Sequence, residues 1–242
     1  MNKNRYILIL FLLVNISFAQ KTNSIKNSKK KIEKTIIPKF EIPLSESSNI
    51  NSVYFYKNVE DKLTKLDTTI TSEQIISLTK YKISEKVIKP KYLDSLFNVI
   101  YKLNEEKKYV EAIEIGKIIL NQSPNNISAI KELGLAYRKI GNENLGNSYF
   151  AMLVKIVKSV FKYGDGTFEF PYLLNNFSEG ISIYEAAFRC KPNKSVIMLD
   201  KKKRLLGAYN GYSSSLDEII IRYSELSHWK SELNKNEYIN QK

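Results

Sequence analysis

Few side chains of this protein belong to the types that carry out covalent or metal chemistry. The chain contains one histidine and one cysteine, His228 and Cys190. General base catalysis near neutral pH, thiol nucleophiles and zinc sites depend largely on these two residue types. His228 stands beside Trp229 and is expected at a helix end or at the surface, and Cys190 is expected to be a small buried apolar side chain. The sequence therefore predicts no catalytic residue, no metal site and no cofactor.

The acidic residues leave one enzymatic alternative open. Asp165 lies between Gly164 and Gly166, but the other acidic ligands that a calcium loop needs at alternate positions are missing, so a tight turn is favoured. Glycoside hydrolysis uses two carboxylates that can be far apart in a sequence. A hydrolase that acts through carboxylates not identified by their spacing is therefore the alternative to a binding protein.

Side chains suited to binding a partner are expected on two helices between residues 91 and 160, where apolar residues recur at helical spacing. If the first helix of each helical pair lines a concave groove, that groove displays Asp94, Phe97, Tyr101, Asn104, Ser128, Lys131, Leu135 and Arg138. Lys131 and Arg138 are seven residues apart and lie on one helical face. We predict a site for a carboxylate or an acidic peptide formed by Phe97, Tyr101, Asn104, Lys131 and Arg138, with solvated charge and ordinary packing as the alternative.

These helices are expected to form two hairpins that repeat at an offset of 34 residues. The second unit has Ile130, Leu133, Gly134, Tyr137, Gly141, Gly146 and Phe150, and the first has Leu96, Val99, Ile100, Leu103, Ala112 and Gly116 at the corresponding positions. The pattern resembles a pair of tetratricopeptide repeats, in which small residues let helix backbones approach closely and aromatic residues fill the space between helices. A polar turn around Pro124 separates the units. Two repeats rarely form a stable solenoid, so flanking segments must cap them.

The flanking segments have different periodicities. Upstream, Thr71 and Gln74 have the spacing of a capping box, which predicts a helix that ends before Pro90. Downstream of the turn at 164–166, β-prone runs at 181–190, 195–200 and 204–210 predict a small antiparallel meander. A closing amphipathic helix is predicted from a capping box at Ser215 and Glu218, with one apolar face formed by Leu216, Ile219, Ile220, Tyr223, Leu226 and Leu233. The predicted fold class is mainly α and α+β overall, with helical hairpins followed by a meander and a C-terminal helix.

The amino terminus predicts export. Lys3 and Arg5 precede an apolar run at 6–18, and small residues stand at Ser17 and Ala19, so residues 1–19 are predicted to be a signal peptide cleaved between Ala19 and Gln20. Cysteine is absent from the cleavage site, which argues against a lipoprotein. The predicted organisation is a basic flexible spacer at 20–50, a helical region at 51–162, a small α+β region at 163–235 and a tail at 236–242.

Charge and cysteine content restrict the partners. Only five of the 38 basic residues are arginine, whereas recognition of bases and phosphates favours the guanidinium group, so no nucleic-acid partner is expected. A single cysteine excludes an intramolecular disulfide. No segment after the predicted cleavage site is long and apolar enough to span a membrane.

The order of signal peptide, helical lead-in with Leu66-Asp-Thr-Thr-Ile70, repeat pair and Gly164-Asp-Gly166 is similar to a domain-of-unknown-function family of exported bacterial proteins (DUF4919-like). That resemblance implies no activity. We therefore predict a non-enzymatic interaction or scaffold protein, periplasmic or extracellular, that binds a protein or an acidic peptide through its helical groove. An envelope hydrolase is the first alternative, and electrostatic association of the basic spacer with an anionic envelope surface is the second.

Overall fold

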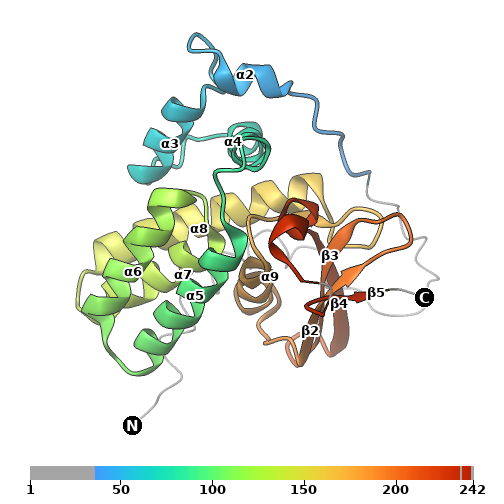
Figure 1. The fold of residues 1–242 in the computed structure, drawn as a ribbon. Coiled ribbons are helices and arrows are strands. Elements are labelled where there is room, and N and C mark those ends of the chain that lie inside the picture. The colour runs from blue at the N-terminus through green and yellow to red at the C-terminus, as the bar shows by residue number, and fades with distance from the viewer. Residues whose placement is uncertain (1–35, 235, 241–242) are drawn as a thin grey trace, which may run out of the picture. The chain divides into compact units, whose positions relative to one another are not determined.

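The structure is a computed structural model that describes residues 36–234 and 236–240 (Figure 1). The chain divides into the units Met1–Ile36 and Ile37–Lys242, and the second is the one described below. The predicted signal peptide and the spacer up to residue 35 lie outside the described residues. The predicted fold class is confirmed, because packed helices are followed by a small sheet.

The helical region contains two long hairpins preceded by shorter helices. Asn126 begins α7 by accepting a hydrogen bond from the Ala129 N–H at 2.9 Å, and Asn142 begins α8 in the same way through the Leu145 N–H at 3.2 Å. The first pair, α5 and α6, starts with a proline at a position where no backbone N–H is needed. The helices are α2 (Leu44–Ser48), α3 (Tyr56–Thr64), α4 (Ser72–Ser84), α5 (Pro90–Glu105), α6 (Tyr109–Gln122), α7 (Ile127–Lys139) and α8 (Glu143–Tyr163).

Small residues at the repeated positions let neighbouring helices pack closely, as the sequence predicted. A Cβ atom placed on Gly116 of α6 would lie 2.5 Å from Cγ of Leu133 on α7. On the other side of α7, a Cβ on Gly134 would lie 3.0 Å from the ring of Phe150 on α8. The first distance is shorter than real Cβ contacts and the second is at the tight end of them, so alanine at Gly116 requires Leu133 to shift and alanine at Gly134 presses on Phe150. The coarse prediction of stacked helical hairpins is confirmed.

The helices before the repeat cap it, and α4 begins where the capping box was predicted. The Gln74 N–H donates to Thr71 Oγ1 at 3.2 Å, and the Thr71 N–H donates to Gln74 Oε1 at 3.0 Å. Within the predicted spacer, residues 44–48 form α2, which packs on α4 through a buried hydrogen bond between Ser47 Oγ and Ser77 Oγ. The apolar side of α4 enters a core shared with α3, α7 and α8.

The C-terminal part is a five-stranded mixed sheet in the order β1-β4-β3-β2-β5. The three central strands form an antiparallel meander, which confirms the runs predicted at 195–200 and 204–210 as strands. The two edge strands are each two residues long and pair in parallel with their neighbours. The strands are β1 (Tyr172–Leu173), β2 (Lys194–Leu199), β3 (Leu205–Ser213), β4 (Glu218–Glu225) and β5 (Ile239–Asn240).

The prediction of a strand at 181–190 was wrong. These residues complete α9 (Phe177–Ile183) and continue as a π-helical turn, η2 (Tyr184–Phe188). A neighbouring helix stabilises the start of α9, since Asp94 of α5 accepts a hydrogen bond from the Ser178 N–H at 2.9 Å. This cap comes from a residue 84 positions away, so local β propensity gave the wrong answer.

The prediction of a closing amphipathic helix was also wrong. Glu218–Glu225 is strand β4, and only Ser227–Glu232 is helical, as the 3₁₀ helix η3. Ile219, Ile220 and Ile221 are consecutive β-branched residues, which pack well on a pleated surface and lose side-chain freedom in a helix. Ser215 lies in the hairpin turn between β3 and β4, and Glu218 is the first residue of β4, so neither caps a helix.

The inner face of the sheet packs on η2. Tyr184, Tyr209 and Ile220 form a small buried cluster there, and the Tyr184 hydroxyl donates toward the carbonyls of Tyr209 at 2.6 Å and Ile220 at 2.9 Å.

In the part of the chain that the structure describes, no helix combines the length and apolar character of a membrane span.

Candidate functional site

The groove side of α5 and α7, on which partner binding was predicted, faces the protein's own α9. This short helix lies between the helical hairpins and the sheet (Figure 1). The hydroxyl of Ser182 on α9 donates to the hydroxyl of Ser128 on α7 at 2.8 Å, and both side chains are buried. The chain therefore fills part of the predicted groove itself.

Lys131 occupies the groove and binds carboxylates of its own chain. Its Nζ lies 2.8 Å from Glu132 Oε1, and it also forms an ion pair with Glu185 of η2. The side chains of Lys131 and Glu185 are 15% and 17% exposed, so this pair is mostly shielded from water. Burial disfavours the charge on Lys131, but the two carboxylates outweigh it and raise its pKa. The ring of Tyr101 lies under both Lys131 and Lys191, and Lys191 donates to the Tyr101 hydroxyl.

The other predicted groove residues have three different positions. Asn104 is buried and donates to Glu132 Oε2 at 2.7 Å, which joins it to the Lys131 cluster. Phe97 is a core residue that is 6% exposed. Its ring centroid lies 5.8 Å from that of Tyr101. Arg138 belongs to a different contact, since its Nε lies 3.0 Å from Glu143 at the start of α8. The structure thus brings Tyr101, Asn104 and Lys131 together, with Phe97 packed against Tyr101, and places Arg138 in a separate contact.

A second polar cluster ties α9 to α7 in the interior. Glu179 is fully buried, and its carboxylate accepts hydrogen bonds from the backbone N–H groups of Ile127 at 2.8 Å and Asn175 at 2.6 Å. It also accepts one from the side-chain amide of Asn175 at 3.0 Å. Loss of hydration on burial outweighs these donors and raises the pKa of Glu179 to about 7. Glu179 is therefore a capping group for α7 that arrives from another helix.

Asp94 of α5 supplies a second carboxylate at this contact, which we call the junction of α5, α7 and α9, and its residue is half-buried. It accepts hydrogen bonds from Asn176 Nδ2 and Ser178 Oγ, each at 2.5 Å, in addition to the Ser178 N–H. Burial raises its pKa despite these donors. Glu179 is held by N–H donors and Asp94 by N–H and O–H donors, and neither lines the pocket between α5 and η3 or the smaller one beside β2 and β5. Their arrangement supports a role in joining α5, α7 and α9.

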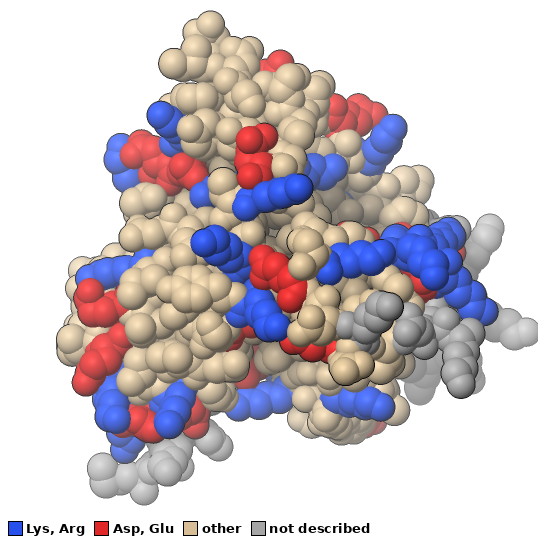
Figure 2. Space-filling model, in the orientation of Figure 1, with Lys and Arg blue, Asp and Glu red and all other residues tan. Residues whose placement is uncertain are grey.

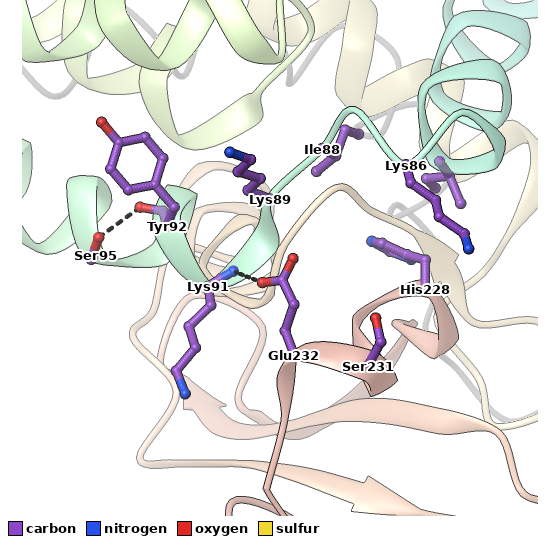
Figure 3. Close-up of a pocket in the computed structure, with 10 residues that line it drawn as sticks. Lys86, Ile88, Lys89, Lys91, Tyr92, Ser95, His228, Ser231 and Glu232 are labelled. Carbon is purple, nitrogen blue, oxygen red and sulfur yellow. Dashed lines mark hydrogen bonds between the residues drawn. The ribbon is translucent and has the colours of Figure 1, made fainter.

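An open pocket of about 660 Å³ lies between the start of α5 and η3 (Figure 3). One wall comes from the connection between α4 and α5 and from the first turns of α5, and the other comes from η3. We call it the basic pocket, because three lysines and one histidine stand around it against one glutamate. Its lining comprises Ile83, Lys86, Ile88, Lys89, Lys91, Tyr92, Ser95, His228, Ser231 and Glu232.

The charges of the basic pocket are only partly neutralised. Glu232 accepts a hydrogen bond from the Lys91 N–H at 3.1 Å, and the Lys91 ammonium turns away to pair with Glu237 at 2.7 Å. Within the described residues, the ammonium groups of Lys86 and Lys89 have neither an ion pair nor a hydrogen bond. Over much of the face in Figure 2, basic and acidic side chains are intermixed, and a group of basic side chains lies together at the right. The pocket therefore offers two cations without a partner in the described part of the chain, beside the apolar side chains of Ile83 and Ile88.

His228 joins the basic pocket to the buried junction. It lines the pocket, and its Nε2 lies 3.0 Å from the carbonyl oxygen of Asn175. Burial lowers the pKa of His228 below its usual value.

Cys190 does not line this pocket. Its side chain is half-buried against the cluster of Tyr184, Tyr209 and Ile220, and burial raises the pKa of its thiol.

Sequence reasoning missed the basic pocket. Lys86, Lys89 and Lys91 form a dense run of lysines before and after Pro90, at the predicted break between two helices, and this was the only local signal. The second wall comes from η3, which is more than 130 residues away in the chain. Since η3 was predicted to be part of a longer helix, its contact with α5 had no signal in the sequence.

No family model matches this chain, and no curated protein or solved structure is detectably similar to it. The resemblance to an exported family of unknown function therefore stays a prediction. Among residues 36–234 and 236–240, no group of three or more histidine, cysteine, aspartate or glutamate side chains is arranged to hold a metal ion.

Proposed function

We propose that this protein is an exported, non-enzymatic interaction protein of the cell envelope, which binds an acidic peptide segment of a protein partner in the basic pocket. The observation that carries the proposal is a pair of ammonium groups, Lys86 and Lys89, that have no partner within the described residues and stand at an open pocket of about 660 Å³. Export follows from the predicted signal peptide. The tetratricopeptide-like hairpins act as the rigid support for one wall of the pocket.

The lining of the pocket favours a peptide over a bare inorganic ion. Binding sites for small ligands usually have volumes of about 300–1,000 Å³ and combine apolar walls with a few polar groups. Here Ile83, Ile88 and the ring of Tyr92 supply apolar surface, while Lys86 and Lys89 supply charge. A segment that alternates acidic and apolar side chains matches both features.

The pocket replaces the predicted groove as the surface proposed for binding. Lys131 was expected to receive a carboxylate beside Tyr101 and Asn104, and Glu185 of the same chain now occupies that position. A partner that binds Lys131 has to displace this shielded carboxylate. Lys86 and Lys89 carry no such competitor among the described residues.

The test is calorimetric titration of the protein with a blocked peptide that alternates aspartate and leucine. We expect Lys86→Ala with Lys89→Ala to weaken binding roughly tenfold, because each exposed ion pair contributes about 0.5–1 kcal/mol. Binding should also weaken with added salt. The matched control is Lys139→Ala with Lys158→Ala, which removes two exposed lysines from other helices.

Two results contradict the proposal. One is no binding of the aspartate peptide by the wild-type protein at low salt, and the other is equal binding by the Lys86/Lys89 variant and the wild type. A peptide that alternates asparagine and leucine tests the requirement for charge and should bind much more weakly.

A further inference from the structure

The single histidine of the chain stands where the basic pocket meets the buried junction. Nε2 of His228 lies 3.0 Å from the Asn175 carbonyl oxygen, which is only an acceptor. Nε2 therefore carries a hydrogen and donates it. In the neutral ring, the other nitrogen, Nδ1, then has a lone pair and is the site at which a further proton binds.

The charged groups around His228 come from every element packed against it. The α4–α5 connection and the first turn of α5 contribute Lys86, Lys89, Lys91 and the phenol of Tyr92. The end of β4 contributes Glu225, η3 contributes Glu232, and Glu179 lies behind Asn175. The carbonyl of Asn175 and the carboxylates of Glu225 and Glu232 favour the imidazolium, but the loss of hydration outweighs them. Near pH 7 and without a ligand, His228 is therefore mainly neutral.

We propose that His228 takes up a proton when an anionic group binds in the basic pocket, so that the ligand is held by an imidazolium together with Lys86 and Lys89. The inference rests on the proposed function and adds its regulation. The proton comes from solvent and binds Nδ1, while Nε2–H keeps its hydrogen bond to Asn175. A ligand carboxylate supplies the negative charge that the pocket lacks, and it thereby compensates for the hydration that the ring has lost.

Proton binding and ligand binding are then linked. A ligand that raises the pKa of His228 by one unit must bind about tenfold more tightly to the protonated protein than to the neutral one. The affinity of the basic pocket for an acidic peptide should therefore increase as the pH falls from 7.5 to about 5.5. Aspartate side chains ionise near pH 3.9, so the charge of the peptide stays nearly constant over this range.

Because the chain has only one histidine, its titration is readable in the untagged wild-type protein. The Cε1–H resonance of His228 is followed by NMR against pH, with and without a saturating amount of the aspartate–leucine peptide. We expect the midpoint to move upward by about one unit and calorimetry to show affinity about fivefold higher at pH 5.5 than at pH 7.5, since the full tenfold is reached only well below the pKa of the free protein. An identical midpoint in the two titrations overturns the inference.

Variants separate this inference from the proposed function. His228→Gln should bind the peptide with an affinity that is nearly independent of pH, whereas Lys86→Ala with Lys89→Ala should weaken binding at every pH and keep the pH dependence. Peptide binding with an unshifted His228 titration overturns the inference alone. Absence of wild-type binding at all pH values overturns both proposals.

Discussion

Glu179 makes a specific prediction about how stability depends on pH. Its carboxyl group is fully buried at the junction of α7 and α9, and its pKa is raised from 4.5 to about 7. The folded protein therefore retains this proton between pH 4.5 and 7, whereas the unfolded chain releases it. The free energy of unfolding must fall as pH rises through this window, because the unfolded state binds fewer protons there.

The magnitude follows from the size of the shift. One pKa unit corresponds to about 1.4 kcal/mol, so Glu179 should lower the free energy of unfolding by about 3 kcal/mol between pH 4.5 and pH 8. That is a large share of the roughly 5–15 kcal/mol by which most domains are stable. The contribution is fully present below pH 4.5, decreases across the window and has been lost above pH 7.

The perturbation is Glu179→Gln, which has nearly the same shape and no titratable proton. Urea unfolding of the variant and the wild type at a series of pH values gives a difference curve that removes the contribution of other groups. We expect the variant to be the less stable protein near pH 4.5, because its amide group faces an N–H donor of Ile127 or Asn175. Its relative stability should then improve by about 3 kcal/mol by pH 8.

The matched control is Glu111→Gln, the same chemical change at an exposed side chain of α6. The reasoning is refuted if the difference curve for Glu179→Gln is flat between pH 4.5 and 8. It is also refuted if the curve slopes the other way, since that would mean that the N–H donors hold the pKa of Glu179 below its ordinary value.

Two further predictions concern packing and charge. Gly180→Ala should lower the free energy of unfolding by about 1–3 kcal/mol, because the new methyl group would overlap the ring of the buried Tyr209. This cost should exceed the gain from the better helix propensity of alanine. Thermal unfolding measures the change, and an unchanged midpoint would contradict the prediction. Lys131→Ala should cost about 3 kcal/mol at neutral pH, because it leaves the carboxylate of Glu132, only 3% exposed, without its cation. Urea unfolding measures that loss, and Lys139→Ala on the same helix is the control that should change little.

Much of the helical part follows from local sequence. The capping box at Thr71 and Gln74 and the small residues Gly116 and Gly134 specify a helix start and close helix contacts by chemistry that acts over a few residues. The positions of these helices were predictable for that reason. The paired strands at 195–200 and 204–210 were predictable because their β-prone residues and turn signals are also local. The segments that were predicted wrongly, at 181–190 and 215–233, are those whose conformation depends on a distant partner.

The candidate binding residues also differ in how far local sequence predicts their contacts. The sequence identified Lys131 as a carboxylate-binding residue beside Tyr101, and the structure places a carboxylate there, but from Glu185 of the same chain. Lys86 and Lys89 were visible only as part of a basic run, and their significance depends on η3 lying opposite them.

The sequence by itself determined which chemistry-bearing side chains the protein has, and it specified the helical hairpins and the strands of the meander, because helix caps, periodicity and small-residue spacing act locally. Only the tertiary structure decided that Asp94 caps α9, that Glu179 caps α7 and that His228 stands at a basic pocket. These contacts join residues more than 50 positions apart, and a buried hydrogen-bonding group takes its partner from whichever segment the fold brings to it.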